Sequence, residues 1–277
     1  MEQGNYWYEY PRPAVTTDCV IFGFDGGELK VLLIERNIEP YNGYWALPGG
    51  FIDMNEDAET CARRKLREET ALENVYIEQL FTFSSVDRDP RYRVISIAYY
   101  ALVKLSDYPA RAGSGAGHVQ WFPLSEVPVL AFDHAGILEM AKQRLKGKIK
   151  YQPIGFELLP EKFTLPELHK LYEMVLETPL DRRNFRKKML SFNLLIDSNE
   201  WAKGAPNRAA KLYRFDKQKY EELSKNGFYL DCEHVGTSKN FVRHAELVSA
   251  SPENKEIAGQ ARNEASVKSI VFRSSHI

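Results

Sequence analysis

Apolar residues in the first half of the chain fall into short β-rich runs separated by glycine or polar turns. Residues Thr16–Asp25 and Leu29–Arg36 are two such runs, and Gly26-Gly27-Glu28 between them predicts a hairpin. The other predicted strands are Tyr44–Leu47, Val75–Phe83, Arg93–Lys104 and Val119–Pro123. Helical spacing predicts helices over Ala58–Thr70 and Phe132–Leu145. Strands interleaved with two helices predict an α/β fold, an α/β/α sandwich around a mixed sheet.

The apolar pattern changes to a helical period in the second half of the chain. Thr164 can cap a helix, and Glu167 completes a capping box with it. The apolar positions of that helix share one face: Leu165, Leu168, Leu171, Tyr172 and Val175. A break at Thr178–Asp181 leads to a second helix, Asp181–Leu190, in which Phe185 and Met189 face inward. A helix, a short turn and a basic helix are typical of a helix-turn-helix.

A two-stranded wing is predicted after the basic helix. The apolar runs Phe192–Ile196 and Leu212–Phe215 flank a polar, basic tip. From residue 181 to 220 there are eleven Lys and Arg against four Asp and Glu. A solvated basic face is one interpretation, but charge on both the helix and the wing favours DNA binding. The predicted DNA-binding residues are Arg182, Arg183, Asn184, Arg186, Lys187, Lys188, Lys203, Arg208 and Lys211.

Composition narrows the class of protein without identifying it. A chain of 277 residues can form two modest domains, and its net charge of -1 excludes a globally basic protein. Cys19, Cys61 and Cys232 are too widely spaced for a metal or disulfide framework, which indicates reduced thiols in the cytoplasm. The N-terminus lacks the pattern of a signal peptide, and no apolar run reaches the length of a membrane span. We therefore expect a cytoplasmic protein with no membrane partner.

Residues Gly49–Leu72 carry the candidate chemistry. A glycine pair follows a predicted strand, and we expect its turn to use positive φ and to bring a carbonyl close to a ligand. The next helix presents carboxylates, which are suited to hard cations and their phosphate ligands. This stretch resembles the Nudix box at Gly50, Glu56, Arg64, Leu66, Glu68, Glu69 and Leu72. The resemblance implies catalytic roles for Glu56, Glu68 and Glu69, with Glu68 and Glu69 as ligands of Mg²⁺.

Two positions depart from the Nudix pattern. Lys65 replaces the first Glu of the helical trio, and Ala71 replaces the last Gly. A cation among the carboxylates would repel a metal ion, and we expect Lys65 to pair with Glu69 one turn further on. The sequence therefore predicts weak or absent Mg²⁺ binding and argues against hydrolysis.

A second charged stretch, Val86–Arg93, holds three arginines and two aspartates before a predicted strand. A solvated turn with local ion pairs is one interpretation, and a ligand loop with forked guanidinium donors is the other. The stretch is similar to the matching segment of regulators that join a Nudix domain to a DNA-binding domain. Together with the region before the box, it supplies the predicted ligand-binding residues Arg36, Trp45, Gly50, Arg64, Arg88, Arg91 and Arg93.

The whole of residues 10 to 222 resembles Nudix-related transcriptional regulators, most specifically at residues 153–160 and 182–188. The resemblance implies a Nudix-like sensing domain (10–148), a winged helix-turn-helix (152–222) and a homodimer on a near-palindromic operator. Residues 230–277 are polar and are predicted to be a disordered tail. The predicted function is a DNA-binding regulator responsive to a nucleotide-sugar such as ADP-ribose, or to a sugar. The alternative is an active Mg²⁺-dependent Nudix hydrolase of ADP-ribose or a related nucleoside diphosphate.

Overall fold

The structure, a computed structural model, describes residues 9–73, 75–105, 117–202 and 210–225. The first half of the chain forms a seven-stranded sheet of order β3-β2-β1-β6-β5, in which β4 also pairs with β1 and β7 with β2. The strands are β1 (Ala14–Phe24), β2 (Leu29–Glu35), β3 (Trp45–Ala46), β4 (Gly49–Phe51), β5 (Glu78–Phe83), β6 (Val94–Lys104) and β7 (Val119–Pro123). Strands β1 and β6 are parallel and the other pairs are antiparallel. The predicted mixed sheet is confirmed.

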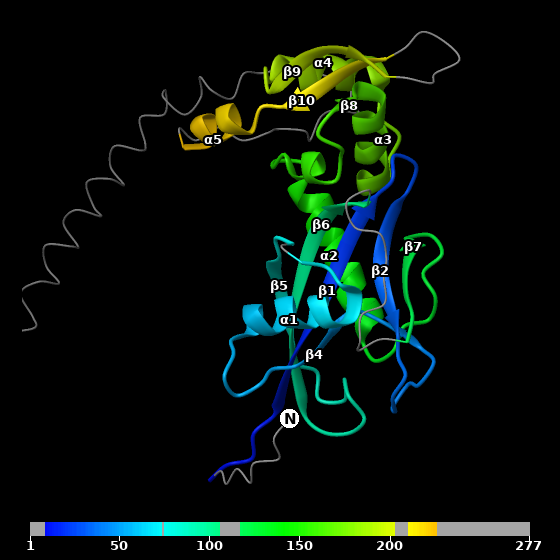
Figure 1. Cartoon of the computed structure of the whole chain (residues 1–277), viewed down its shortest axis with the longest axis vertical. Coiled ribbons are helices and arrows are strands. Elements are labelled where there is room, and N and C mark those ends of the chain that lie inside the picture. Colours follow the sequence, from blue (N-terminus) through cyan, green and yellow to red (C-terminus); the bar gives the residue numbers. More distant parts are fainter. Residues whose placement is uncertain (1–8, 74, 106–116, 203–209, 226–277) are drawn as a thin grey trace, which may run out of the picture. The chain divides into compact units, whose positions relative to one another are not determined.

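Two helices cover the faces of this sheet, α1 (Ala58–Thr70) in front of the strands and α2 (His134–Lys148) behind them in Figure 1. Neighbouring residues of a strand point to opposite faces. Ile21 accordingly shares a buried cluster with Leu66 of α1, whereas Phe22 shares one with Ile137 of α2. The alternating strand therefore builds both cores of the predicted sandwich.

The glycine pair of the box differs from the prediction. Gly49 and Gly50 are strand residues opposite Asp18 and Thr17 of β1, and neither has positive φ. Space is the reason for glycine here. A Cβ on Gly49 would lie 2.1 Å from the carbonyl oxygen of Thr17, and one on Gly50 would lie 2.7 Å from Cε of Lys65. The predicted turn is wrong: strand register brings the backbone carbonyl of Thr17 against Gly49, whereas Gly50 faces the flexible side chain of Lys65.

Several element ends also differ from the predicted ones. Strand β5 begins at Glu78 rather than Val75, and β3 is shorter than predicted. Helix α2 begins at His134, because Phe132 has a φ of 53°, outside the helical range. The same helix continues past Leu145 to Lys148, and lysines in its last turn complement the helix dipole.

The second half of the chain is a winged helix. A three-stranded sheet of order β8-β10-β9 accompanies three α-helices and a 3₁₀ helix, Ile154–Glu157. The other elements are β8 (Phe163–Thr164), α3 (Leu165–Leu176), α4 (Arg182–Ser191), β9 (Leu195–Trp201), β10 (Lys211–Phe215) and α5 (Lys217–Lys225). The predicted capping box is confirmed, with Thr164 N donating to Glu167 Oε2 at 2.7 Å and Glu167 N donating to Thr164 Oγ1 at 3.3 Å.

The core of the winged helix also follows the predicted pattern. Phe185 and Met189 of α4 are 1% and 2% exposed and pack with Tyr172 of α3 in one cluster. Helix α5 was not predicted. The predicted tail, 230–277, and the wing residues Lys203 and Arg208 lie outside the described residues. No helix among the described residues has both the length and the apolar character needed to span a membrane.

Candidate functional site

The Nudix box is held together by an arginine–glutamate pair. Arg64 donates to Glu56 through Nε at 2.9 Å and again through Nη2. Nη2 also donates to the carbonyl of Phe51 at 3.2 Å, so Arg64 joins the end of β4 and the loop after it to α1. The hydrogen bonds from Arg64 lower the pKa of Glu56 to about 2. Glu56 is therefore an ionised, bonded carboxylate at neutral pH.

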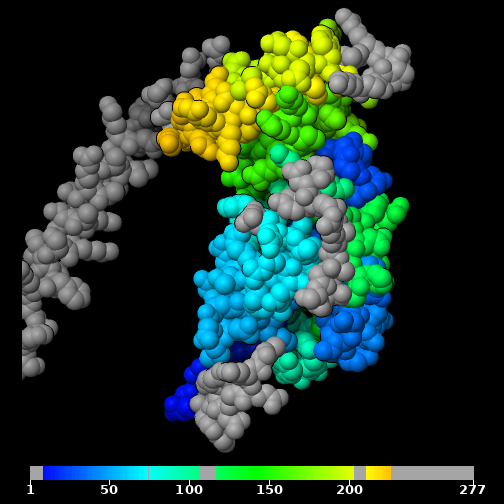
Figure 2. Space-filling model, in the orientation of Figure 1, coloured from blue at the N-terminus to red at the C-terminus, as the bar shows by residue number. Residues whose placement is uncertain are grey.

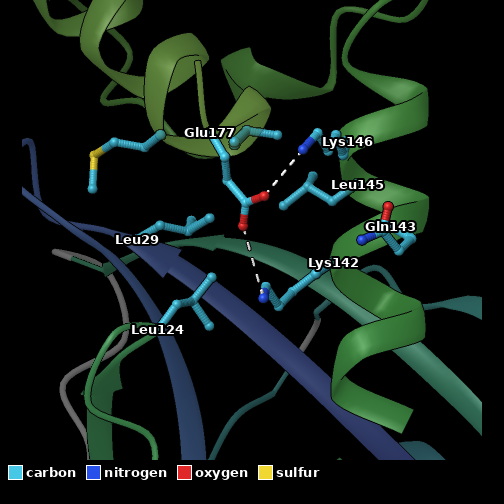
Figure 3. Close-up of a pocket in the computed structure, with 9 residues that line it drawn as sticks. Leu29, Leu124, Lys142, Gln143, Leu145, Lys146 and Glu177 are labelled. Atoms are coloured by element: carbon cyan, nitrogen blue, oxygen red, sulfur yellow. Dashed lines mark hydrogen bonds and ion pairs between the residues drawn. The ribbon is translucent and has the colours of Figure 1, made fainter. Parts of the chain in front are cut away.

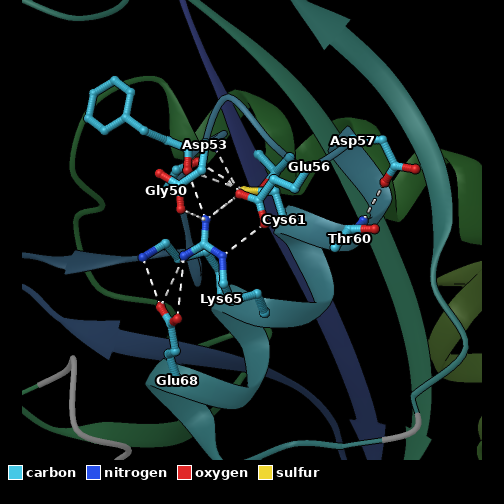
Figure 4. A network of polar contacts seen from close by, with 11 residues as sticks. Gly50, Asp53, Glu56, Asp57, Thr60, Cys61, Lys65 and Glu68 are labelled. Carbon is cyan, nitrogen blue, oxygen red and sulfur yellow. Dashed lines mark hydrogen bonds and ion pairs between the residues drawn. The ribbon is translucent and has the colours of Figure 1, made fainter. Parts of the chain in front are cut away.

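Lys65 pairs with Glu68. Its Nζ lies 3.0 Å from Glu68 Oε2, and Arg64 Nη1 lies 3.3 Å from the same oxygen. Burial opposes ionisation of Glu68, but the hydrogen bond and charge of Lys65 lower the pKa of this carboxyl. The expected pairing of Lys65 with Glu69 is wrong, because Lys65 meets Glu68 on one side of α1 (Figure 4). Glu69 is bonded instead to the backbone of Gly49 in β4.

Glu69 has the opposite environment. Its Oε2 accepts a hydrogen bond from Gly49 N at 2.9 Å, where β4 meets β1. Burial raises the pKa of Glu69 to about 7, and the nearby charge of Asp18 adds to that effect. The two neighbouring acids of the box therefore ionise in different pH ranges.

These glutamates do not fit a Mg²⁺ site. Glu56 accepts from Arg64, Glu68 from Lys65, and Glu69 from the backbone of Gly49. A hard cation needs several free oxygen ligands, and here a lysine ammonium occupies the acidic side of the helix. No group of three His, Cys, Asp or Glu side chains in the described ranges, 9–73, 75–105, 117–202 and 210–225, could hold a metal ion.

Arg88 is buried in a polar network behind the box. Its Nη2 and Nε lie 2.7 and 2.9 Å from the two oxygens of Asp133, and Nη2 lies 3.3 Å from Asp18. Its side chain is only 4% exposed. The ion pairs raise the pKa of Arg88 against the effect of burial, which lowers it. Arg88 thus fixes the 86–93 loop to the N-cap of α2 and to β1.

His134 belongs to the same network. Its Nδ1 accepts a hydrogen bond from Leu47 N at 2.9 Å, so the proton of the neutral ring is on Nε2, 3.5 Å from Asp18 Oδ1. Burial lowers the pKa of His134 and favours this neutral form. Ser96 Oγ donates to the other oxygen of Asp18 at 2.5 Å. Asp18 therefore contacts Arg88 of the 86–93 loop, Ser96 of β6 and His134 of α2.

Two arginines of the predicted ligand set, Arg36 and Arg91, lie against the ring of Phe132. We call these three residues, together with Tyr41 and Phe51, the Phe132 cluster. The guanidinium carbons of Arg36 and Arg91 lie 4.8 and 5.7 Å from the centre of the Phe132 ring, and Tyr41 packs edge-on at 4.7 Å. Arg91 also lies 5.6 Å from the ring centre of Phe51.

The electrostatics of the Phe132 cluster favour an anion. Burial lowers the pKa of Arg36, and the neighbouring charge of Arg91 lowers it further. Asp89 partly offsets the charge of Arg91, with Nη2 and Oδ2 2.7 Å apart, whereas Arg36 donates to the backbone carbonyls of Pro40 and Ile38. Two guanidiniums with aromatic rings match the phosphates and the base of a nucleotide.

The remaining predicted ligand residues make contacts within the protein. Trp45 packs edge-on against Phe122 at 4.7 Å. Arg93 donates to the carbonyls of Ser84 and Ser85, each at 2.8 Å. Gly50 faces Lys65, and Arg64 and Arg88 hold the networks above. Their contacts with a ligand stay predictions, whereas Arg36 and Arg91 are the two that converge on one surface.

The predicted DNA-binding residues of α4 lie on its outer side. Asp181 caps the helix by accepting from Asn184 N at 2.8 Å. The side chains that face solvent are Arg182, Arg183, Asn184, Arg186 and Lys187, while Lys188 is half-buried. Lys211 of β10 pairs with Asp197 of β9. Figure 2 shows this part of the chain, coloured yellow-green, at the surface. A basic helix beside a wing can contact phosphates and base edges together.

Asp18, Phe132, Asp133 and His134 were not predicted to belong to the site. The last three are the first residues of the predicted helix, and an Asp at the start of a helix usually indicates an N-cap. Asp133 instead uses its carboxylate on Arg88 and makes no side-chain cap. No local signal indicates the role of Asp18, which lies in the middle of an apolar strand.

Two family models match the chain. A NUDIX domain matches residues 12–141, and an NrtR DNA-binding winged helix domain matches residues 155–215. The chain is 37% identical over 217 residues to the ADPR responsive transcriptional repressor NtrR of Acinetobacter baylyi, covering 77% of this chain and 86% of that protein. It is also 38% identical over 130 residues to the ADP-ribose pyrophosphatase of Methanocaldococcus jannaschii, covering 47% of this chain and 73% of the relative.

A solved structure extends the likeness to both folds. The crystal structure of Shewanella oneidensis NrtR complexed with a 27mer DNA has a TM-score of 0.65 and 35% sequence identity, and the match covers 78% of this chain and 97% of that one. The likeness therefore includes the Nudix fold and the winged helix in one continuous chain.

Proposed function

The chain belongs to the NrtR family of Nudix-related transcriptional repressors, and from this premise we propose that it binds operator DNA under the control of ADP-ribose. Residues 10–148 form the sensing domain and residues 152–222 the DNA-binding domain. The observation that carries the proposal is the likeness over most of its length to a repressor named as ADPR responsive. The solvent-facing basic side of α4 supports DNA as the partner.

We infer that ADP-ribose binds at the Phe132 cluster. Its pyrophosphate needs positive charge with forked donors, which Arg36 and Arg91 supply, and its adenine can stack on an exposed or half-buried ring. Tyr41 and Phe132 both have positive φ, 67° and 53°, and such conformations in bulky residues concentrate at functional sites. Tyr92, 50% exposed, lies beside Phe51 at the same surface.

Binding without hydrolysis is the activity that the box supports. The relative named ADP-ribose pyrophosphatase raises hydrolysis as the second candidate. In this chain, however, Lys65 and Arg64 bond to Glu68, and Arg64 bonds to Glu56. Since Arg64 pairs with Glu56 and two cations lie at Glu68, we propose that the Nudix domain holds ADP-ribose as an effector and does not cleave it.

We propose that the DNA-binding form is a homodimer. A symmetric dimer presents two copies of α4 to two half-sites, which implies a near-palindromic operator with half-sites separated by about one helical turn of DNA.

The test is a fluorescence-anisotropy titration on duplex DNA from upstream of the chain's own gene. Random duplex serves as competitor over a salt series, with ADP-ribose, ADP or ribose added at each step. We expect preference for the upstream DNA and a change in affinity on addition of ADP-ribose only. Equal binding to both duplexes would contradict the DNA-binding proposal, and a change with ribose alone would contradict the effector.

A further inference from the structure

Two ion pairs of Glu177 join the sensing fold to the winged helix in the described residues. Glu177, at the C-terminal end of α3, lies 3.0 Å from Lys146 and 3.8 Å from Lys142, measured between each Nζ and the nearer carboxylate oxygen. Both lysines belong to α2. Figure 3 shows Glu177 between these two lysines, above Leu145. We define Lys142, Lys146 and Glu177 as the α2–α3 clasp.

An apolar contact lies under the clasp. Leu145 of α2 and Val175 of α3 are 1% and 5% exposed and belong to the same buried cluster. A small pocket between them is lined also by Leu29, Leu124 and Met174 (Figure 3). Helices α2 and α3 therefore pack against each other through apolar side chains. The pair of Lys146 with Glu177 fixes the position of the C-terminal end of α3 relative to α2.

The other end of α2 lies at the proposed effector site. Phe132, two residues before the helix, is the ring to which Arg36 and Arg91 converge. Asp133 at the N-cap is bonded to Arg88, and His134 in the first turn is bonded to Leu47. Helix α2 has 15 residues, so about 22 Å separate its ends. One continuous helix thus reaches from the effector site to the clasp.

Helix α3 in turn holds the start of the basic helix. Leu180, just before the N-cap of α4, has both backbone groups bonded to side chains of α3. Its N–H donates to Glu173 Oε1 at 2.9 Å, and its carbonyl accepts from His169 Nε2 at 3.0 Å. Glu177 lies between these anchors and α4 and has a φ of 53°, the left-handed conformation that ends α3. A shift at Glu177 therefore changes the turn that orients α4.

We propose that the α2–α3 clasp couples the effector site to the DNA-binding helix, with Glu177 as the positioning residue. The proposal rests on the proposed function of the chain. ADP-ribose acts on Arg36, Arg91 and Phe132, α2 moves as one body, and the pair of Lys146 with Glu177 transfers that movement to the α3–α4 turn. Both sites bias one helix, which is the physical requirement for coupling between distant sites.

The test separates coupling from binding. In the full chain, DNA affinity is measured with and without saturating ADP-ribose, and the ratio of the two affinities is compared among variants. We expect Glu177→Gln and Lys146→Gln to reduce that ratio at least threefold, with ADP-ribose affinity within about twofold of the wild type. Because the two residues act through one contact, the double variant should be no more impaired than Glu177→Gln alone.

The matched control is Lys162→Gln, which removes an ion pair with Glu200 inside the winged helix, 2.6 Å long and similarly exposed. Its ratio should equal that of the wild type. A wild-type ratio in Glu177→Gln would overturn the coupling role while leaving the regulator itself intact. An equal loss in the Lys162→Gln control would also overturn it, since any surface charge would then suffice. If the DNA affinity of the wild type did not change with ADP-ribose, the proposed function would be refuted instead.

Discussion

Lys65 Nζ lies 3.0 Å from Glu68 Oε2, so a lysine neutralises the side of the Nudix helix on which the box otherwise gathers negative charge. Arg64 adds a second cation 3.3 Å from the same carboxylate oxygen. The carboxylate that the box pattern assigns to a metal ion therefore has two cationic side chains as partners, whereas a hard cation needs oxygen ligands.

Replacing Lys65 by Glu should create metal binding. The change removes the cation and the hydrogen bond to Glu68 and adds an oxygen ligand, so we expect Mn²⁺ to bind at least about tenfold more tightly. Isothermal titration calorimetry with MnCl₂ measures the effect. Lys65→Gln is the control, because it removes the charge without adding a carboxylate. Wild-type protein that cleaves ADP-ribose as fast as Lys65→Glu would show that the lysine does not suppress hydrolysis.

Replacing Glu56 by Gln should destabilise the fold in a pH-dependent way. The folded pKa is about 2 and the usual value is 4.5, so the carboxylate stabilises the fold above about pH 4.5 and loses this effect as the pH falls toward 2. A hydrogen bond to a charged partner contributes about 1.5–3 kcal/mol. The thermal midpoint of Glu56→Gln should lie below that of the wild type by clearly more at pH 7 than at pH 3. An equal loss at both values would contradict the ion-pair explanation.

Glu69→Gln should have the opposite dependence on pH. The folded pKa of Glu69 is about 7, above the usual 4.5, so its stabilising contribution is complete below about pH 4.5 and is lost as the pH rises through 7. Gln can still accept the hydrogen bond from Gly49. We therefore expect the variant to be more stable than wild type at pH 8, by on the order of 1 kcal/mol, and nearly equal at pH 4.5. A gain that does not grow between these two pH values would rule out the buried carboxyl as its source.

Arg36→Gln and Arg91→Gln should each weaken ADP-ribose binding. Loss of a charge-assisted hydrogen bond to a phosphate corresponds to about ten- to hundredfold in affinity. Calorimetry with ADP-ribose gives the dissociation constants directly. The control is Arg63→Gln, an arginine of α1 that pairs with Glu59 at 2.8 Å. Should the control lose as much affinity as the two variants, the effect would be one of net charge and the Phe132 cluster would not be the site.

Alanine substitutions along α4 should separate phosphate contacts from base contacts. A residue that contacts a phosphate weakens binding to all duplexes alike and lowers the salt dependence, whereas a residue that reads a base weakens only specific binding, by about 1–3 kcal/mol. Arg182, Arg183 and Arg186 are the variants to compare, by anisotropy over a salt series. Arg67→Ala, on α1, is the control. If none of the α4 variants differs from this control, α4 does not contact DNA.

The amino-acid sequence alone determined the local features of this fold, namely its helix caps, its first hairpin and the buried faces of its elements. The pairing of Thr164 with Glu167, the cap of Asp181 on α4 and the hairpin at Gly26–Glu28 each depend on residues within a few positions of one another. The alternation of β1 and the inward spacing of Phe185 and Met189 follow from the strand and helix periods. These features are specified within one element, so the residues themselves predict them, and the Nudix resemblance supplies the fold that joins them.

Only the tertiary structure decided the contacts between elements. Arg88 and Asp133 are 45 positions apart, and their bond depends on where the loop crosses the start of α2. The requirement for glycine at position 49 arises from the carbonyl of Thr17 across the sheet, which strand register brings to 2.1 Å from the place of a Cβ. Lys65 likewise pairs with Glu68 and not with Glu69 because Glu69 is buried against β4. Spacing along the chain predicts which residues share a helix face. The packing of that helix on its sheet decides which of those side chains is exposed and can form an ion pair.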